Sequence, residues 1–186
     1  MILIGIAGRA RSGKTTTAEH IAACLSLDLY HIAYPVKQAC AAALSITPLQ
    51  FDALNRNKKL PELNLTPREF MQYMGDLLIT ANSHFLINRT KYTIETDYGD
   101  HWQNTAGYVI GDVRTVNEAD YIYQNGGFLI HVQRDETAQT PAHRTENDLT
   151  IRECDYLITN NGDTRELQKK LDILVDVLKH RLKVTA

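Results

Sequence analysis

The chain has 186 residues, of which 44% are hydrophobic and 23% are charged, and its formal net charge at pH 7 is −2. These values are ordinary for one globular domain with a substantial core, and two full domains would be cramped in this length. The charge balance provides no overall positive field for a polynucleotide, and no apolar run approaches the roughly 20 residues that span a bilayer, so we expect a cytoplasmic protein with small-molecule partners.

The chain opens with an apolar strand over residues 2–7, and a glycine-bounded loop follows. The loop, Gly8 to Thr15, has the spacing G-x-x-x-x-G-K-[ST] of a phosphate-binding P-loop and runs into a helical pattern. Its glycines let backbone N–H groups turn inward, and the helix start adds the positive end of its dipole. Lys14 can reach the β- and γ-phosphates of a nucleoside triphosphate, and the Thr15 hydroxyl is placed to ligate Mg²⁺. The residues predicted to bind the triphosphate are Gly8, Arg11, Ser12, Gly13, Lys14, Thr15 and Thr16.

The middle of the chain is predicted to be mostly helical. We expect a helix over 15–27, a short strand over 30–34, a helix over 36–44, and another that begins at Pro48 with Thr47 as its cap. Residues 55–65 are polar and predict a loop. Thr66 and Glu69 form a capping box around Pro67, which predicts a helix to about Asn82. Residues 91–106 are polar and acidic without a strong period, so we predict a loop there.

The last third of the chain alternates strands with helices. Strands are predicted over 108–112, 128–132 and 156–159, with helices over 115–124 and after the turn at 160–163. This alternation predicts an α/β fold in which helices cover both faces of a parallel sheet. We expect one domain with a core of about 1–37 and 107–186, a helical acceptor-binding insertion of about 38–106, and a lid of about 134–147. Ligands bind at the carboxyl ends of such strands, where the P-loop, Asp112 and Arg134 fall.

Three classes of P-loop protein compete for this sequence. A GTPase switch needs D-x-x-G and N-K-x-D elements, but no Asp is followed three residues later by Gly, and Asn57-Lys58-Lys59-Leu60 lacks the aspartate. A motor or DNA-dependent ATPase would normally carry a basic track. A small-molecule kinase needs only the P-loop, a substrate-binding insertion and arginines, because phosphoryl transfer depends on positioning and charge neutralisation. The kinase fits best.

Arginines beyond the P-loop are therefore the candidate catalytic and binding residues. Arg114 lies just past a buried strand beside Asp112, which favours contact with a ligand, and Arg134 also follows a strand directly. Arg68 lies in the first turn of a capped helix, and Arg144 lies within the lid. Asp112 has three open roles: holding the Mg²⁺ shell, accepting a hydrogen bond from the substrate sugar, or pairing with Arg114.

Read together, several segments of the chain resemble the deoxynucleoside monophosphate kinases typical of bacteriophages. The order and spacing of the segments carry the resemblance, whereas taken singly only the P-loop is specific. The family usually has Gly-Thr where this chain has Gly75-Asp76. The segments are Gly8 to Thr16, Tyr34-Pro35-Val36-Lys37, Thr66 to Gly75, Asp112 to Ala119, Gly126-Gly127, His143-Arg144-Thr145-Glu146 and Asp155 to Gly162.

The resemblance implies a P-loop kinase fold and a phosphotransferase. ATP with Mg²⁺ would donate its γ-phosphoryl group in line to the 5′-phosphate of a (deoxy)nucleoside monophosphate, without a covalent intermediate. Kinases for other phosphorylated metabolites, such as phosphomevalonate and dephospho-coenzyme A, share parts of the pattern and form the alternative, ahead of a non-catalytic nucleotide-binding switch.

The resemblance also assigns residues. Lys37, Arg68, Gln72 and Arg114 would line the acceptor site, and Asp112 is a further candidate for substrate binding from its position at the end of a strand. Asn160 and Asn161 would lie near the adenine, and a phage origin would place the protein in the host cytoplasm. A homodimer is left open, and neither a polynucleotide nor a membrane is an expected partner. The residues expected to act in catalysis are Lys14, Arg114, Arg134 and Arg144, and those expected at the metal are Thr15 and Asp112.

Overall fold

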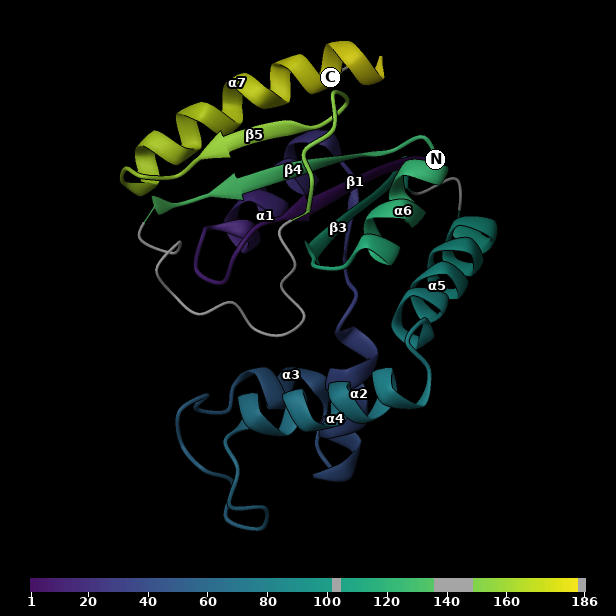
Figure 1. Ribbon diagram of the computed structural model, residues 1–186, viewed down its shortest axis with the longest axis vertical. Coiled ribbons are helices and arrows are strands. Elements are labelled where there is room, and N and C mark those ends of the chain that lie inside the picture. Colours follow the sequence, from purple (N-terminus) through teal and green to yellow (C-terminus); the bar gives the residue numbers. More distant parts are fainter. Residues whose placement is uncertain (102–104, 136–148, 184–186) are drawn as a thin grey trace. The chain divides into compact units, whose positions relative to one another are not determined.

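The computed structural model describes residues 1–101, 105–135 and 149–183 (Figure 1). The chain divides into two compact units, Met1–His31 with Thr93–Ala186, and Ile32–Tyr92. Arg144 and nearly all of the expected lid lie outside the described residues. Within the described residues, no helix is both long and apolar enough to cross a membrane.

The first unit is built on a parallel five-stranded sheet with the strand order β2-β3-β1-β4-β5. Because all five strands are parallel, their carboxyl ends meet at one edge of the sheet, which is where ligands bind in this architecture. The strands are β1 (Ile2–Ala7), β2 (Asp28–His31), β3 (Gly107–Val113), β4 (Phe128–Gln133) and β5 (Tyr156–Thr159).

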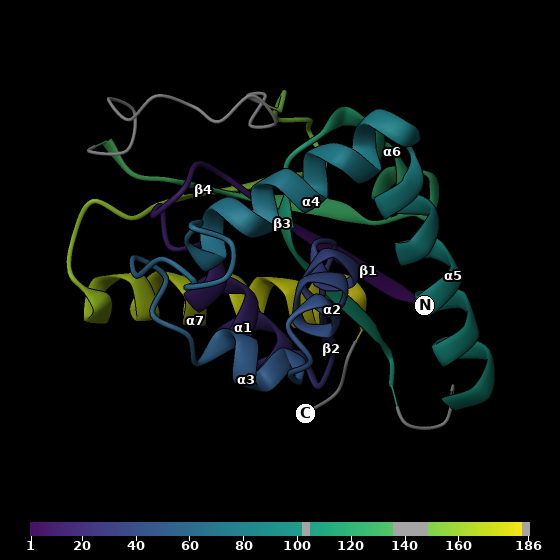
Figure 2. The same cartoon turned by 90° about the horizontal axis from the view of Figure 1, so that it is seen from below.

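Helices cover both faces of this sheet, as the α/β pattern predicts (Figure 2). On one face, α1 (Lys14–Leu25) and α7 (Thr164–Leu182) bury an apolar cluster that includes Ile4, Ile130 and Leu171. On the other face lies α6 (Val116–Gln124), which packs closely on β1 because Gly5 has no side chain: a Cβ atom there would collide with Ile122 of α6. The three inner strands β1, β3 and β4 are thus almost entirely buried, and the loops at their carboxyl ends start from this core.

The second unit consists of α2 (Tyr34–Ala43), α3 (Pro48–Asp52), α4 (Pro67–Ala81) and the first part of α5 (Phe85–His101). The expected capping boxes are confirmed: the Gln50 backbone N–H donates to the Thr47 hydroxyl, and the Glu69 N–H donates to that of Thr66. The hydrogen bond from the Thr66 backbone lowers the pKa of Glu69 below its ordinary value. A small apolar core holds α2, α3 and α4 together through Val36, Cys40, Ala41 and Phe51, with Phe70, Met71, Met74 and Leu78 packed against it.

Two expectations about secondary structure are wrong. Residues 91–101 belong to α5, not to a loop. The buried side of this helix is formed by Ile87, Thr90 and Ile94, and because only Ile94 lies in the polar stretch, that stretch shows no apolar period by itself. The short strand ends at His31, and Tyr34 already starts α2, because a proline is accepted in the first turn of a helix as readily as after a strand.

Candidate active site

The P-loop joins β1 to α1 at the carboxyl edge of the sheet, and its glycines are required by the backbone. Gly8 and Gly13 have φ angles of 145° and 106°, which side chains rarely allow. A Cβ atom at Gly8 would also collide with the carbonyl oxygen of Val132 in β4. The first hydrogen bond of α1 runs from the Thr17 N–H to the Gly13 carbonyl, at 3.0 Å. The N–H groups before it lie at the positive end of the helix, which is the arrangement that binds phosphate.

Lys14 is buried at the start of α1, and its ammonium group is held by the loop itself. The Nζ atom donates to the carbonyl oxygens of Gly8 at 2.6 Å and Arg9 at 2.8 Å. It also lies 3.3 Å from the carboxylate Oδ1 of Asp112 in β3. The structure thus brings the P-loop lysine together with the acidic residue that the sequence places at the end of a neighbouring strand.

Asp112 is held in an unusual backbone conformation between two cations. Its φ of 71° lies in the left-handed region, next to an irregularity where β3 pairs with β1, and such strain is concentrated at functional sites. Its Oδ2 accepts hydrogen bonds from both Nε, at 2.9 Å, and Nη2 of Arg114. Burial alone would raise the pKa of Asp112, but Arg114 and Lys14 more than offset this and hold it below its ordinary value. The carboxylate is therefore ionised at neutral pH.

Glu118 in α6 fixes the backbone that carries Arg114, and sequence reasoning missed it as part of the site. Its Oε2 accepts hydrogen bonds from the N–H groups of Arg114 at 2.7 Å and Thr115 at 3.0 Å. Burial raises the pKa of Glu118 despite these bonds. The signal in the sequence was the capping box that Glu118 forms with Thr115.

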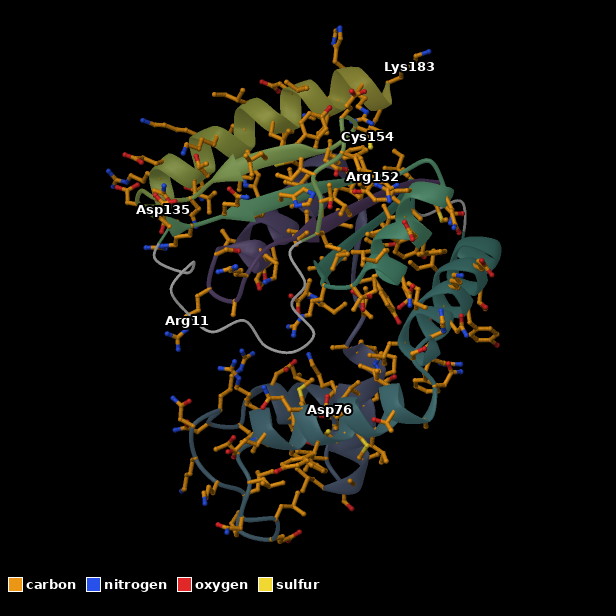
Figure 3. The ribbon with its side chains drawn as sticks, in the orientation of Figure 1. Arg11, Asp76, Asp135, Arg152, Cys154 and Lys183 are labelled. Atoms are coloured by element: carbon orange, nitrogen blue, oxygen red, sulfur yellow. The ribbon has the colours of Figure 1, made fainter. Side chains whose placement is uncertain are left out.

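The ends of β4 and β5 meet the P-loop at the same edge. Arg134 is half-buried directly after β4. The Asp135 backbone N–H donates to Asn161 Oδ1 at 3.0 Å, and Asn161 Nδ2 donates to the Asp135 carboxylate at 2.7 Å. Asn160 Nδ2 donates to the Ser12 carbonyl of the P-loop at 2.8 Å. Figure 3 shows Asp135 at the end of β4 and Arg11 on the P-loop.

The expected acceptor residues of the second unit lie on two helices. Lys37 of α2 forms an ion pair of 2.8 Å with Asp52 of α3, a partner that sequence reasoning missed because no local pattern links the two. Arg68 is exposed and Gln72 half-buried, one helical turn apart on α4. These residues share a unit, whereas Lys14, Asp112 and Arg114 belong to the other.

Side chains that commonly bind metals do not cluster in the described part of the chain. It contains no group of three or more His, Cys, Asp or Glu side chains that could hold an ion. Asp112 Oδ1 is buried and accepts no hydrogen bond from described residues, although it faces Lys14 across the ion pair. One carboxylate and the Thr15 hydroxyl are a donor set that fits Mg²⁺, which keeps several of its waters.

Comparison with known proteins decides the family. The family model described as deoxynucleotide monophosphate kinase matches residues 46–171. The chain belongs to the deoxynucleotide monophosphate kinase family. A protein of Acanthamoeba polyphaga mimivirus, provisionally named as such a kinase, is 30% identical over 95% of this chain and 97% of its own length. The deoxynucleotide monophosphate kinase of Escherichia phage RB69 is 26% identical over 92% of this chain and 98% of its own length.

Membership of this family makes the chain a phosphotransferase and confirms the resemblance drawn from its motifs. The fold agrees. A crystal structure from Chloroflexus aurantiacus, provisionally described as a kinase, matches with a TM-score of 0.52 at 16% identity, over 99% of this chain and 97% of that one. The predicted P-loop kinase fold, a parallel sheet with helices on both faces, is therefore confirmed.

Proposed function

We propose that this chain transfers the γ-phosphoryl group of ATP to the 5′-phosphate of a deoxynucleoside monophosphate and releases ADP and the diphosphate. The observation that carries the proposal is the cluster of Lys14, Asp112 and Arg114 beside the P-loop of a chain that belongs to this family. Two fixed cations next to a phosphate-binding loop supply the charge stabilisation that phosphoryl transfer needs.

The P-loop would bind the donor. The backbone N–H groups from Gly13 to Thr16, with the neighbouring Arg11 and Ser12, would surround the phosphate oxygens. Lys14 would exchange the Gly8 and Arg9 carbonyls, which it now contacts, for β- and γ-phosphate oxygens. The Ser12 hydroxyl is fully buried and finds no hydrogen-bond partner among the described residues, so a phosphate oxygen would supply one.

Mg²⁺ would be held by the Thr15 hydroxyl and Asp112, and it would neutralise charge on the donor phosphates when bound. Asp112 suits this role because its carboxylate is kept ionised by Arg114 and Lys14. Its pairing with Arg114 also orients the guanidinium group, so two of the roles open to Asp112 are compatible.

The acceptor phosphate would be bound by arginine and lysine side chains. Arg114 would hold it with a charge-assisted contact while Asp112 and Glu118 fix the side chain and the backbone of this arginine. Arg68 and Gln72 would contact the acceptor from α4. Lys37 would exchange the carboxylate of Asp52 for phosphate, or remain the link that holds α2 to α3.

Arg134 and Arg144 would complete the positive surroundings of the transferring group, and the segment of about 134–147 would exclude water so that ATP is not hydrolysed. We place the reaction in the cytoplasm of a host cell. Support for this comes from relatives in a phage and a giant virus, and from substrates that belong to the cellular nucleotide pool.

An acceptor panel tests the proposal. ADP release would be coupled to NADH oxidation with each deoxynucleoside monophosphate, each ribonucleoside monophosphate, dephospho-coenzyme A and phosphomevalonate. We expect at least one deoxynucleotide to give the highest kcat/KM. Release of ADP only with one of the metabolites would favour the alternative kinase, and ATP binding without acceptor-dependent ADP release would indicate a binding module.

A further inference from the structure

The side chain of Asn160 makes a buried contact with Ser12 of the P-loop, although the two residues are 148 positions apart in the sequence. Asn160 follows the last residue of β5 and is only 7% exposed. Its Nδ2 donates to the carbonyl oxygen of Ser12 at 2.8 Å. Its own backbone N–H donates to the Gln133 carbonyl at the end of β4, at 2.7 Å. The amide is therefore fixed to the sheet on one side and to the loop on the other.

This contact determines which way one peptide group of the loop faces. No cis peptide bond occurs in the described chain, so the carbonyl of Ser12 and the N–H of Gly13 point in opposite directions. Because Asn160 holds the carbonyl, the Gly13 N–H faces away from Asn160 and β5. Rotation of this peptide would leave a buried carbonyl without its partner, which costs more than the bond itself contributes.

Gly13 and Asn160 also fit each other sterically. A Cβ atom on Gly13 would lie 2.6 Å from Asn160 Nδ2, closer than real Cβ contacts, and the φ of 106° at Gly13 disfavours a side chain as well. The second glycine of the P-loop is thus needed both for its backbone angle and for the approach of the asparagine amide. Only an amide nitrogen at this place can donate to Ser12, since a carboxylate of the same shape has no proton to give.

We propose that Asn160 is a positioning residue that holds the Ser12–Gly13 peptide in the orientation required for triphosphate binding. In this role Asn160 acts through the loop, to which one of the two N–H donors of its amide is bound, and contact with the adenine base is the alternative that the test excludes. The inference rests on the proposed function only in taking a triphosphate as the donor.

The test compares binding of a ligand that has a base with one that has none. The dissociation constants of MgATP and of inorganic triphosphate would be measured by calorimetry for the wild type and for Asn160→Ala and Asn160→Asp. We expect Asn160→Ala to weaken both ligands by a similar factor, about tenfold, as for one lost hydrogen bond that leaves a buried carbonyl unpaired. Asn160→Asp should weaken both further, because two acceptors would then face each other. Because aspartate has nearly the same shape as asparagine, this variant allows the test to be made even if the alanine variant does not fold.

The matched control is Lys170→Ala. Lys170 of α7 donates to the backbone carbonyl and the hydroxyl of Thr159, so it fastens the end of the same strand without touching the P-loop. We expect its ligand affinities to stay within about twofold of the wild type, since an exposed bond contributes little. Thermal melts would show how far each variant is destabilised.

Three results would overturn the inference. One is a loss of ATP affinity in Asn160→Ala with unchanged triphosphate affinity, which would assign Asn160 to the base. Another is a loss of ligand affinity in Lys170→Ala as large as that in Asn160→Ala, when the two variants melt at the same temperature. The third is a wild type that does not bind triphosphate. Failure of the proposed function would look different, because the wild type would then bind triphosphate but transfer no phosphoryl group to a nucleotide.

Discussion

The ammonium nitrogen of Lys14 lies 3.3 Å from the Oδ1 atom of Asp112, which joins the phosphate-binding loop to the neighbouring strand β3. The carboxylate also holds Arg114, so one ionised group organises two cations. In the resting enzyme these three charges partly compensate each other. Arrival of the donor phosphates would redistribute them, and the predictions about activity start from this cluster.

Arg114→Ala should lower kcat/KM for the acceptor by about 100- to 1000-fold, or about 3–4 kcal/mol of transition-state stabilisation, because a charge-assisted phosphate contact is lost. Steady-state kinetics with the acceptor varied would measure it. Arg152→Ala is the control, since Arg152 is an arginine of the same unit that pairs with Asp120 and stacks on Tyr123. If both variants retain wild-type kinetics, Arg114 does not bind the acceptor.

Gly75→Ala should stabilise the protein and at the same time weaken acceptor binding. Gly75 lies inside α4 on the face of Arg68 and Gln72, and a Cβ atom there would meet nothing among the described residues outside its own helix. Alanine in a helix interior is favoured over glycine by about 0.5–1 kcal/mol. If the acceptor packs across this face, its KM should rise while the KM for ATP stays constant.

The control for this variant is Thr80→Ala, an exposed position elsewhere around α4 that should alter stability without altering either KM. Thermal melts and kinetics on both variants complete the comparison. A Gly75→Ala enzyme that melts higher and keeps its KM for the acceptor would exclude this face of α4 from the acceptor site.

Asp155→Asn should lower the free energy of unfolding by about 2 kcal/mol at neutral pH, because an amide cannot accept all of the bonds that the carboxylate receives. The side chain of Asp155 is fully buried and accepts hydrogen bonds from the N–H groups of Leu129 and Arg152 and from the Tyr123 hydroxyl, with His131 3.3 Å away. Burial raises the pKa of Asp155, but these bonds lower it more, so it lies below its ordinary value.

The sign of the pH dependence follows from that direction. The unfolded chain takes up this proton at a higher pH than the folded chain, so the contribution of Asp155 is complete above the unfolded pKa of about 4 and is lost as the pH falls through the folded value. Urea unfolding from pH 7 to pH 3 should therefore show the gap between wild type and Asp155→Asn closing below about pH 4. A constant gap would contradict the buried carboxylate. The control is Asp120→Asn, whose carboxylate forms only a partly exposed ion pair with Arg152, so its unfolding free energy should differ little from that of the wild type at any pH.

Local signals in the sequence predicted the parts of this molecule that depend on neighbouring residues. The strand over 156–159 and the helix starts at Thr47 and Thr66 agree with the structure, because alternation, proline placement and capping act within a few residues. Residues 91–101 of α5 were predicted to be a loop because only a narrow stripe of this helix is buried, formed by Ile87, Thr90 and Ile94, and only Ile94 lies in the polar stretch.

The candidate site, too, could be predicted from the sequence only in part. The P-loop motif and the strand-end position of Asp112 were readable, and the structure brings them together. The partners of other candidate residues could not be predicted from the sequence. Asp52 meets Lys37, and Asn160 meets Ser12, only after the chain has folded. Contacts between residues far apart in sequence leave no periodicity or spacing from which a single sequence could predict them.

The most direct test of the account is transfer of labelled phosphate. Wild-type enzyme would be incubated with ATP labelled at the γ-position and the best acceptor of the panel, alongside Lys14→Ala and the surface variant Lys170→Ala. We predict that the label appears in the deoxynucleoside diphosphate with the wild type and Lys170→Ala, and that Lys14→Ala slows transfer at least about 1000-fold, because the charge on the γ-phosphate is no longer compensated. Full transfer by Lys14→Ala, or label released by the wild type only as inorganic phosphate, would contradict it.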